Sequence, residues 1–417
     1  MKKDKIFIQI ASYRDPELLP TIKSCIENAK YPENLVFSIS WQHAEEDEWD
    51  DLTPYKADDR FKIIDINYLD SDGVCWARNL LQQQFDDEEY TLQLDSHHRF
   101  APNWDEECIA MIKNLQEAGW EKPLLTAYIP SYNPDREPDG REQEPWRQTF
   151  DRFAPEGVVH TLPESMSGYE ERNLPEPTRF YSGHFTFGKG TFVKEVPHDP
   201  NYYFHGEEIS LAVRAYTWGY DLFHPHKVVA WHEYTRKGKS HQWDDVKKWH
   251  IKNDGSFKRN RVLFGMEKGD EGDIDLGQYG FGTVRPLSDY EKYSGISFGR
   301  RSVQQYTLDK KVPPNPVLSD EEYESSFVQM FKHCIDVGHD LVPETDYDFW
   351  VVAFHGPDDE TIYRLDANEE EIKGLLSDPE GYCKIWREFQ TSIYPKYWVV
   401  WPHSKSKDWC ERITGDL

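Results

Sequence analysis

Long apolar runs are missing from this sequence. No stretch approaches the roughly 18 consecutive apolar residues that a membrane-spanning helix needs. Residues 1–5 are mostly charged and lead straight into a short apolar segment, without the hydrophobic region of a signal peptide. We therefore expect a cytoplasmic protein that does not insert into a membrane.

Cysteine is scarce and shows no motif. The 417 residues include six cysteines, none of them in a Cys-x-x-Cys pair. Disulfide-stabilised small domains and cysteine zinc sites both need closely spaced cysteines. The distribution instead fits separate buried thiols in a reducing compartment.

Positive charge is in deficit. The chain has 48 Lys and Arg against 76 Asp and Glu, a formal net charge of −28. Proteins that bind nucleic acids gain most of their affinity from clustered cations on phosphates, so this balance disfavours that class. A local basic groove remains open as an alternative, with Arg259 and Arg261, or Lys237 and Lys239, as its candidates.

What the sequence does contain is enough apolar and aromatic residues for a large core, 38% and 15% respectively. Residues 5–11, 35–41 and 61–66 have the composition of buried strands, and residues 17–29 show helical spacing of apolar side chains. This order of strand, helix, strand, strand predicts a Rossmann-like half of an α/β fold.

A polar motif ends the next predicted strand. Residues 91–94 are apolar or strand-like, and Asp95-Ser96-His97 follows them. In an extended backbone, residues two apart face the same way, so Asp95 and His97 can bind one divalent cation. Since Asp-x-His also arises by chance, a capped strand end with a surface histidine is the simpler alternative.

Two further segments predict a site for an anionic ligand. Polar residues 12–15 follow the first strand, where nucleotides bind in open α/β sheets. Gly73 precedes a predicted helix that carries Arg78, and a helix N-terminus with an arginine suits a phosphate. Alternatively, Arg78 is a surface salt-bridge partner.

Acidic and histidine candidates lie further along the chain. Glu207 and Glu208 follow a glycine and open a predicted helix, while His232 follows the predicted strand 228–231. The helix dipole alone would account for one of the two carboxylates. Two adjacent glutamates in a polar loop point to a functional site.

The remaining segments carry no readable motif. Residues 133–177 lack periodicity, and we expect a long functional loop or lid. Residues 300–316 predict a linker. Beyond it we expect a small α+β module with helices at 320–337 and 378–390 and strands at 347–355 and 397–401, which is either structural or an acceptor-docking element.

Taken together, these motifs resemble the GlcNAc-transferase family, whose described members use UDP-GlcNAc to modify hydroxyproline of a cytoplasmic protein. The same order also resembles the polypeptide GalNAc transferases. The resemblance rests on residues 8–15, on Asp95-Ser96-His97, on Gly206-Glu207-Glu208, on Trp231-His232-x-Tyr-x-Arg236 and on residues 280–291.

The resemblance covers about residues 5–300 and implies a GT-A fold, which we assign to residues 1–305. From the change in sequence character we assign residues 306–417 to the accessory α+β module. It implies transfer of a sugar, with GlcNAc favoured, from a UDP-sugar to a hydroxyl with retention at the anomeric carbon. Mn²⁺ or Mg²⁺ would be the cofactor. The implied metal ligands are Asp95, His97 and His232, the implied donor-binding residues are Ser12, Tyr13, Arg14, Asp15, Asp72, Arg78, Ser96 and Trp231, and Glu207 and Glu208 would be catalytic.

Several points stay open at this stage. His98 follows His97, and His224 and His226 precede His232, so the identity of the liganding imidazoles is ambiguous. The acceptor is a protein hydroxyl in the favoured interpretation, with a hydroxylated DNA base or a polysaccharide as alternatives. A sugar-binding protein without catalysis is a further alternative, as is a metallohydrolase, although two-metal hydrolases usually need more carboxylates.

Overall fold

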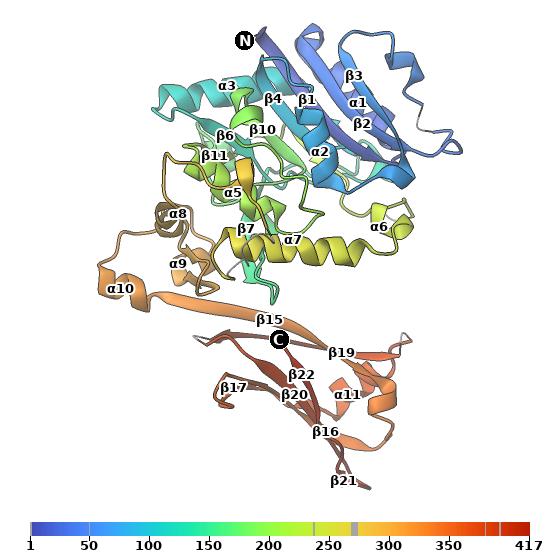
Figure 1. The fold of residues 1–417 in the computed structure, drawn as a ribbon, viewed down its shortest axis with the longest axis vertical. Coiled ribbons are helices and arrows are strands. Elements are labelled where there is room, and N and C mark those ends of the chain that lie inside the picture. The colour runs from blue at the N-terminus through green and yellow to red at the C-terminus, as the bar shows by residue number, and fades with distance from the viewer. Residues whose placement is uncertain (1, 50, 237, 268–273, 380, 392) are drawn as a thin grey trace. The chain divides into compact units, whose positions relative to one another are not determined.

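The computed structural model describes residues 2–49, 51–236, 238–267, 274–379, 381–391 and 393–417. Its contacts divide the chain into two compact units, each described here by itself (Figure 1). The single domain boundary after residue 305 stays a prediction. The first unit comprises Met1–Phe150, Thr161–Gly295 and Lys310–Pro316, and the second comprises Asp151–His160, Ile296–Asp309 and Val317–Leu417.

The first unit is organised on an eight-stranded sheet in the order β3-β2-β1-β4-β10-β6-β11-β9. Its first four strands are parallel and form the Rossmann-like half expected from the sequence. Ile8 lies between Phe37 and Leu92 on the neighbouring strands, and all three side chains are fully buried. These strands are β1 (Lys2–Tyr13), β2 (Leu35–His43), β3 (Phe61–Asn67) and β4 (Glu88–Asp95).

The other half of the sheet is mixed. Strand β10 runs antiparallel to both β4 and β6, while β11 is parallel to β6. This arrangement confirms the α/β class, with a central mixed sheet. The strands are β6 (Pro123–Thr126), β9 (Glu176–Pro177), β10 (Phe185–Lys189) and β11 (Asp221–His224), and a separate two-stranded sheet joins β5 (His98–Phe100) to β12 (Ala230–His232).

Helices connect these strands, as the apolar spacing predicts. Leu18, Ile22 and Cys25 recur at helical intervals and are fully buried against the sheet. The helices of the first unit are α1 (Leu18–Asn28), α2 (Val74–Gln82), α3 (Trp104–Glu117), α4 (Thr191–Glu195), α5 (Glu207–Thr217), α6 (Gln242–Asp245), α7 (Trp249–Leu263) and α8 (Leu287–Ser294).

Residues 133–177, expected to be a long functional loop or lid, contain regular structure that the sequence did not indicate. Within this segment β7 (Trp146–Phe153) and β8 (Val159–Ser165) form a two-stranded sheet. Phe150 and Phe153 are buried on β7, so this segment contributes apolar side chains of its own. Charged residues and a proline interrupt the alternation of apolar and polar residues in these short strands, so the sequence does not indicate them.

The second unit is dominated by strands, and both helices expected there are wrong. Residues 320–337 form only the short helix α10 before the long strand β15, and residues 378–390 fall mostly in strand β19. Along β19 buried and exposed side chains alternate, which is the period of a strand. The expected strands at 347–355 and 397–401 are confirmed as β16 and part of β20.

Two sheets build this unit. β15 pairs with β14 and β19, and β16 and β20 form the centre of a six-stranded sheet. Phe331, Ile335, Trp350 and Phe354 contribute to the core of this unit. The elements are β13 (Ile296–Ser297), β14 (Ser302–Gln304), α9 (Gln305–Leu308), α10 (Asp320–Ser325), β15 (Phe327–Gly338), β16 (Tyr347–His355), β17 (Thr361–Arg364), β18 (Ala367–Asn368), α11 (Glu369–Leu376), β19 (Tyr382–Thr391), β20 (Tyr397–Ser404), β21 (Asp408–Trp409) and β22 (Ile413–Asp416).

The structure bears on two features of the composition, the lack of long apolar runs and the scattered cysteines. In the described part of the chain, none of the helices combines the length and apolarity required to cross a bilayer. All six cysteines are free thiols, and four of them are buried.

Asp105 on α3 offers a test of the first unit's packing. Its buried carboxylate accepts the backbone N–H of Lys30 through Oδ1, at 2.7 Å, and that of Tyr31 through Oδ2, at 2.9 Å. Asp105→Asn replaces one of these acceptors by a donor and leaves a partly buried backbone N–H without its acceptor. We expect a loss of about 1–3 kcal/mol in the free energy of unfolding, measured by urea denaturation. A variant as stable as the wild type would contradict this account.

Candidate active site

Three side chains from distant parts of the first unit converge at the carboxyl end of β4. One ligand atom from each of Asp95, His97 and His232 lies within 4.8 Å of the others. Asp95 Oδ2 is 3.8 Å from Nε2 of His97 and 3.5 Å from Nε2 of His232. The two imidazole rings lie with their centroids 4.7 Å apart. A carboxylate and two imidazoles arranged in this way can hold one divalent cation.

Backbone pairing explains how His232 reaches Asp95. The chain turns directly after β4 into β5, whose first residue, His98, lies opposite His232 on β12. The β5–β12 pairing therefore returns a distant segment to the end of β4. His97 is held in the turn between β4 and β5.

The structure also separates the competing histidines. His232 is buried, and neither of its ring nitrogens has a hydrogen-bond partner. Both ring nitrogens of His224 are engaged by backbone, through Thr126 O and the N–H of Gln148. His98 Nδ1 contacts the carbonyl of Asp95, and neither His98 nor His226 belongs to the cluster.

Electrostatics keep the ligand atoms in the forms that a metal needs. Burial would raise the pKa of Asp95, but His232 and the Arg78 guanidinium hold this pKa well below its usual range. Arg78 Nη2 donates to Asp95 Oδ1 at 2.7 Å, which leaves Oδ2 facing the histidines. Burial lowers the pKa of His232 to about 4. At neutral pH the site therefore holds a carboxylate and a neutral imidazole.

The two glutamates lie behind this cluster at the start of α5, after Gly206 in the left-handed conformation (φ 91°). Glu207 accepts hydrogen bonds from Arg78 and from the thiol of Cys75. Arg78 therefore bridges Glu207 and Asp95, and it is a buried ion-pair partner instead of a surface one.

Glu208 has a different environment. Its carboxyl accepts the Tyr128 hydroxyl at 2.7 Å and the Gly183 N–H at 2.8 Å. Burial raises its pKa to about 7, because the charged form loses its hydration. At neutral pH Glu208 can therefore either hold or accept a proton.

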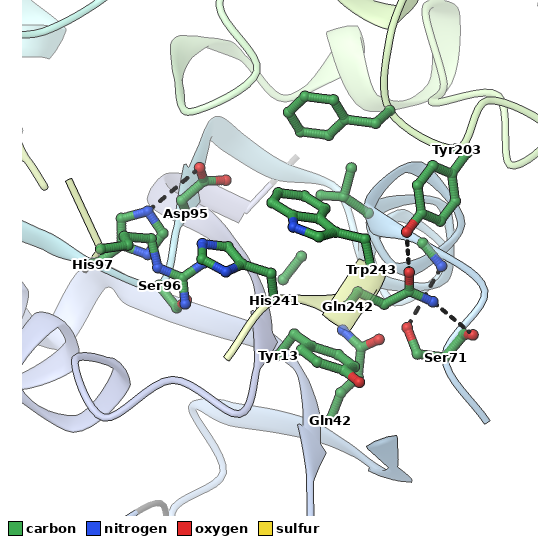
Figure 2. A pocket seen from close by; sticks show the side chains of 15 residues that line it. Tyr13, Gln42, Ser71, Asp95, Ser96, His97, Tyr203, His241, Gln242 and Trp243 are labelled. Carbon is green, nitrogen blue, oxygen red and sulfur yellow. Dashed lines mark hydrogen bonds and ion pairs between the residues drawn. The ribbon is translucent and has the colours of Figure 1, made fainter. Parts of the chain in front are cut away.

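A pocket opens beside the Asp95 cluster, with a cavity volume of about 130 Å³ and a wide opening to solvent. Figure 2 shows Asp95 and His97 at one end of it and Tyr203, Gln242 and Ser71 at the other. Its walls carry a high proportion of aromatic side chains, which suits a planar ring flanked by polar groups. The lining residues include Tyr13, Gln42, Ser96, Tyr203, Phe204, Arg236, His241 and Trp243.

Arg236 and residues 238–245, called here the closing segment, form one side of the pocket. Within it, the His241 imidazole stacks on the Trp243 indole, with centroids 4.7 Å apart. Asp245 accepts the Tyr13 hydroxyl at 2.7 Å, and Gln242 Nε2 donates to Ser71 O at 3.2 Å. These bonds hold the segment against the ends of the strands.

Of the expected donor-binding residues, Tyr13 and Ser96 line the pocket, while others make contacts around it. Arg14 forms a two-point ion pair with Asp47 and reaches Asp245. Asp15 and Ser12 are fully buried, and Asp15 accepts from His97 and Ser96. Asp72 pairs with Lys252, and Trp231 donates to Glu142 O.

Several lining residues were not expected from the sequence. Gln42, Tyr203 and Phe204 come from the end of β2 and the loop before α5, and His241 and Trp243 from the closing segment. None belongs to a local motif, since their common position arises only from the fold. The sequence offered one indication, a tryptophan at position 243 within a polar stretch. In the structure the Trp243 side chain is 40% exposed.

The described lysine and arginine candidates for a basic groove are all paired with carboxylates. Arg259 pairs with Asp199, and Arg261 with Glu267. Lys239 pairs with Glu233 and Glu17, while Lys237 lies outside the described residues. The described candidates are therefore already compensated by carboxylates.

The chain matches the model of one known protein family. A family model described as Glycosyltransferase (GlcNAc) matches residues 5–58 and 50–300. No curated protein matches the chain significantly.

Solved structures similar to the chain include GalNAc-T7 with UDP, GalNAc and Mn²⁺, at 11% identity over 98% of this chain and 68% of that chain, with a TM-score of 0.49. S. aureus TarS is similar at 11% identity over 99% of this chain and 77% of that chain, with a TM-score of 0.36. Mannosyltransferase PcManGT from Pyrobaculum calidifontis, in complex with GDP-Man and Mn²⁺, is similar at 12% identity over 60% of each chain, with a TM-score of 0.36.

The raised pKa of Glu208 predicts a specific pH dependence of stability. Because its folded pKa of about 7 exceeds the ordinary 4.5, its contribution is fully present below about pH 4.5 and is lost as the pH rises through 7. Between pH 5 and pH 8 the wild type should lose on the order of 2 kcal/mol that Glu208→Gln does not lose.

Urea unfolding of both proteins at the two pH values measures this difference. A stability gap between wild type and Glu208→Gln that is the same at both pH values would show that the carboxyl titrates normally.

Proposed function

The chain belongs to the GlcNAc glycosyltransferase family, and on this premise we propose that it transfers a sugar from a UDP-sugar to a hydroxyl group with the help of a divalent cation. One observation carries the proposal. A cluster of Asp95, His97 and His232 lies at the end of a pocket whose aromatic walls suit the planar base of a nucleoside.

The donor set fits a hard or borderline cation. One carboxylate oxygen and two imidazole nitrogens suit Mn²⁺ or Mg²⁺ with positions left for a substrate, whereas structural zinc favours a closed set of thiolates or imidazoles. We propose that Asp95, His97 and His232 hold this cation. When bound, it would stabilise the negative charge on the diphosphate leaving group.

The pocket would hold the nucleoside of the donor. Tyr13 and Ser96 line it directly, and Arg236 contributes a cation near the Asp95 cluster. We propose that Arg14 acts from outside the pocket, since its ion pairs fix Asp245 and with it the closing segment. In the same way, Ser12, Asp72 and Trp231 would shape the pocket from its periphery.

We propose different roles for the two glutamates. Glu208 has a pKa of about 7, so it can receive the proton of the acceptor hydroxyl at neutral pH. Glu207 holds the Arg78 guanidinium, which in turn lies on Asp95 and offsets its charge. Transfer would proceed with retention, as the family resemblance implies.

The finer features of the substrate also rest on the resemblance. We propose GlcNAc as the sugar and a protein hydroxyl, of hydroxyproline or of Ser or Thr, as the acceptor. The net charge of −28 and the paired cations disfavour a DNA base. A sugar-binding protein without catalysis would have no need for the buried cluster of ionisable groups.

A screen of UDP-sugars for hydrolysis or transfer with Mn²⁺ tests the proposal. We expect activity in the wild type and its loss, by about two or more orders of magnitude, in Asp95→Ala and His232→Gln, since each removes a metal ligand. His226→Gln is the matched control, because it removes a buried histidine outside the cluster and should leave activity intact.

Two results would reject the proposal. Full turnover in excess EDTA would exclude a metal-dependent reaction, and an active Asp95→Ala would show that the cluster is not the catalytic centre.

A further inference from the structure

Asp15 is the most heavily bonded carboxylate near the proposed metal centre. Its side chain is fully buried at the end of β1. Oδ2 lies 2.8 Å from His97 Nδ1 and 2.6 Å from Ser96 Oγ, with Arg236 Nη2 at 3.3 Å. Oδ1 instead accepts the Glu17 N–H, at 3.0 Å, just before α1. The two oxygens therefore face different parts of the structure.

The contact with His97 determines where the ring carries its proton. A carboxylate oxygen can only accept, so Nδ1 of His97 must be the donor in this pair. In a neutral imidazole the other nitrogen, Nε2, then has a free lone pair. This is the nitrogen that faces Asp95 Oδ2, 3.8 Å away.

We propose that Asp15 is a positioning residue for the metal centre, which fixes His97 in the Nδ1–H tautomer and orients Nε2 as a ligand. The inference rests on the proposed function, because it assigns a role toward the cation of that same site. It differs from the donor-binding role that the family resemblance implies. Asp15 does not line the pocket but lies behind Ser96 and His97, which do.

The same carboxylate connects the metal centre to the closing segment. Arg236 lines the pocket and reaches Asp15 Oδ2, the atom that also holds His97 and Ser96. A carboxylate that holds the second nitrogen of a liganding imidazole raises the basicity of the ligand and restricts its rotation. Asp15 combines this role with an anchor for Arg236.

The variant Asp15→Asn distinguishes the orienting of His97 from the support of the backbone at Glu17. The two roles belong to different carboxylate oxygens, Oδ2 and Oδ1. With the amide oxygen kept toward the Glu17 N–H, the amide NH₂ faces three donors at the former Oδ2 position. His97 Nδ1 can then only accept from the amide, so the proton moves to Nε2 and blocks the ligand lone pair. The other amide orientation abolishes the bond to Glu17.

Two measurements test this on the intact protein labelled with ¹⁵N-histidine. We expect NMR to show the Nδ1–H tautomer of His97 in the wild type and the Nε2–H tautomer in Asp15→Asn. We expect the affinity for Mn²⁺ alone, measured by electron paramagnetic resonance, to fall about 10- to 100-fold in the variant. Asp105→Asn is the matched control, since it alters an equally buried carboxylate away from the cluster and should change neither readout.

The outcomes are distinguishable. Unchanged Mn²⁺ affinity in folded Asp15→Asn would overturn this inference while leaving the proposed function intact. A wild type that binds no Mn²⁺ would overturn the metal centre and this role together. Should Asp15→Asn fail to fold, the wild-type tautomer decides, and an Nε2–H ring at His97 would refute the inference.

Discussion

The first unit depends on keeping one carboxylate ionised inside the protein. Asp95 ends a buried strand, and its carboxylate, with a quarter of the side chain exposed, has lost part of its hydration. Arg78 compensates it on one oxygen, and the imidazoles of His97 and His232 border the other. The buried Arg78 also pairs with Glu207, and the β5–β12 pairing brings His232 to Asp95. The same ion pair thus keeps Asp95 ionised for binding a cation and places Arg78 in the interior.

Features encoded locally could be predicted from the sequence. The parallel strands contain short segments rich in apolar residues, and the Asp95–His97 motif follows one of them. Arg78 and Glu207 could be named as candidates but not as partners, because their bond joins α2 to α5 across the fold. Gln42 and Tyr203 could not be found at all, since only the tertiary structure brings them to one pocket.

The errors in the second unit have a physical cause as well. The acidic start of residues 320–337 is typical of a helix, and it does form one turn and a half at α10. The following residues are buried at alternate positions through pairing with β19, which lies far along the chain. Strand formation there depends on this long-range partner, so local propensity was a poor guide.

The bond from Arg78 to Asp95 has a consequence for how a cation would be held. The protein offers a single anionic ligand, and that anion already shares its charge with a guanidinium. Fewer negative ligands mean looser binding of a divalent ion. Much of the charge of a bound divalent cation would therefore remain uncompensated by the protein. If the proposed UDP-sugar donor binds there, its diphosphate would supply the missing negative charge, and cation and donor would each strengthen the binding of the other.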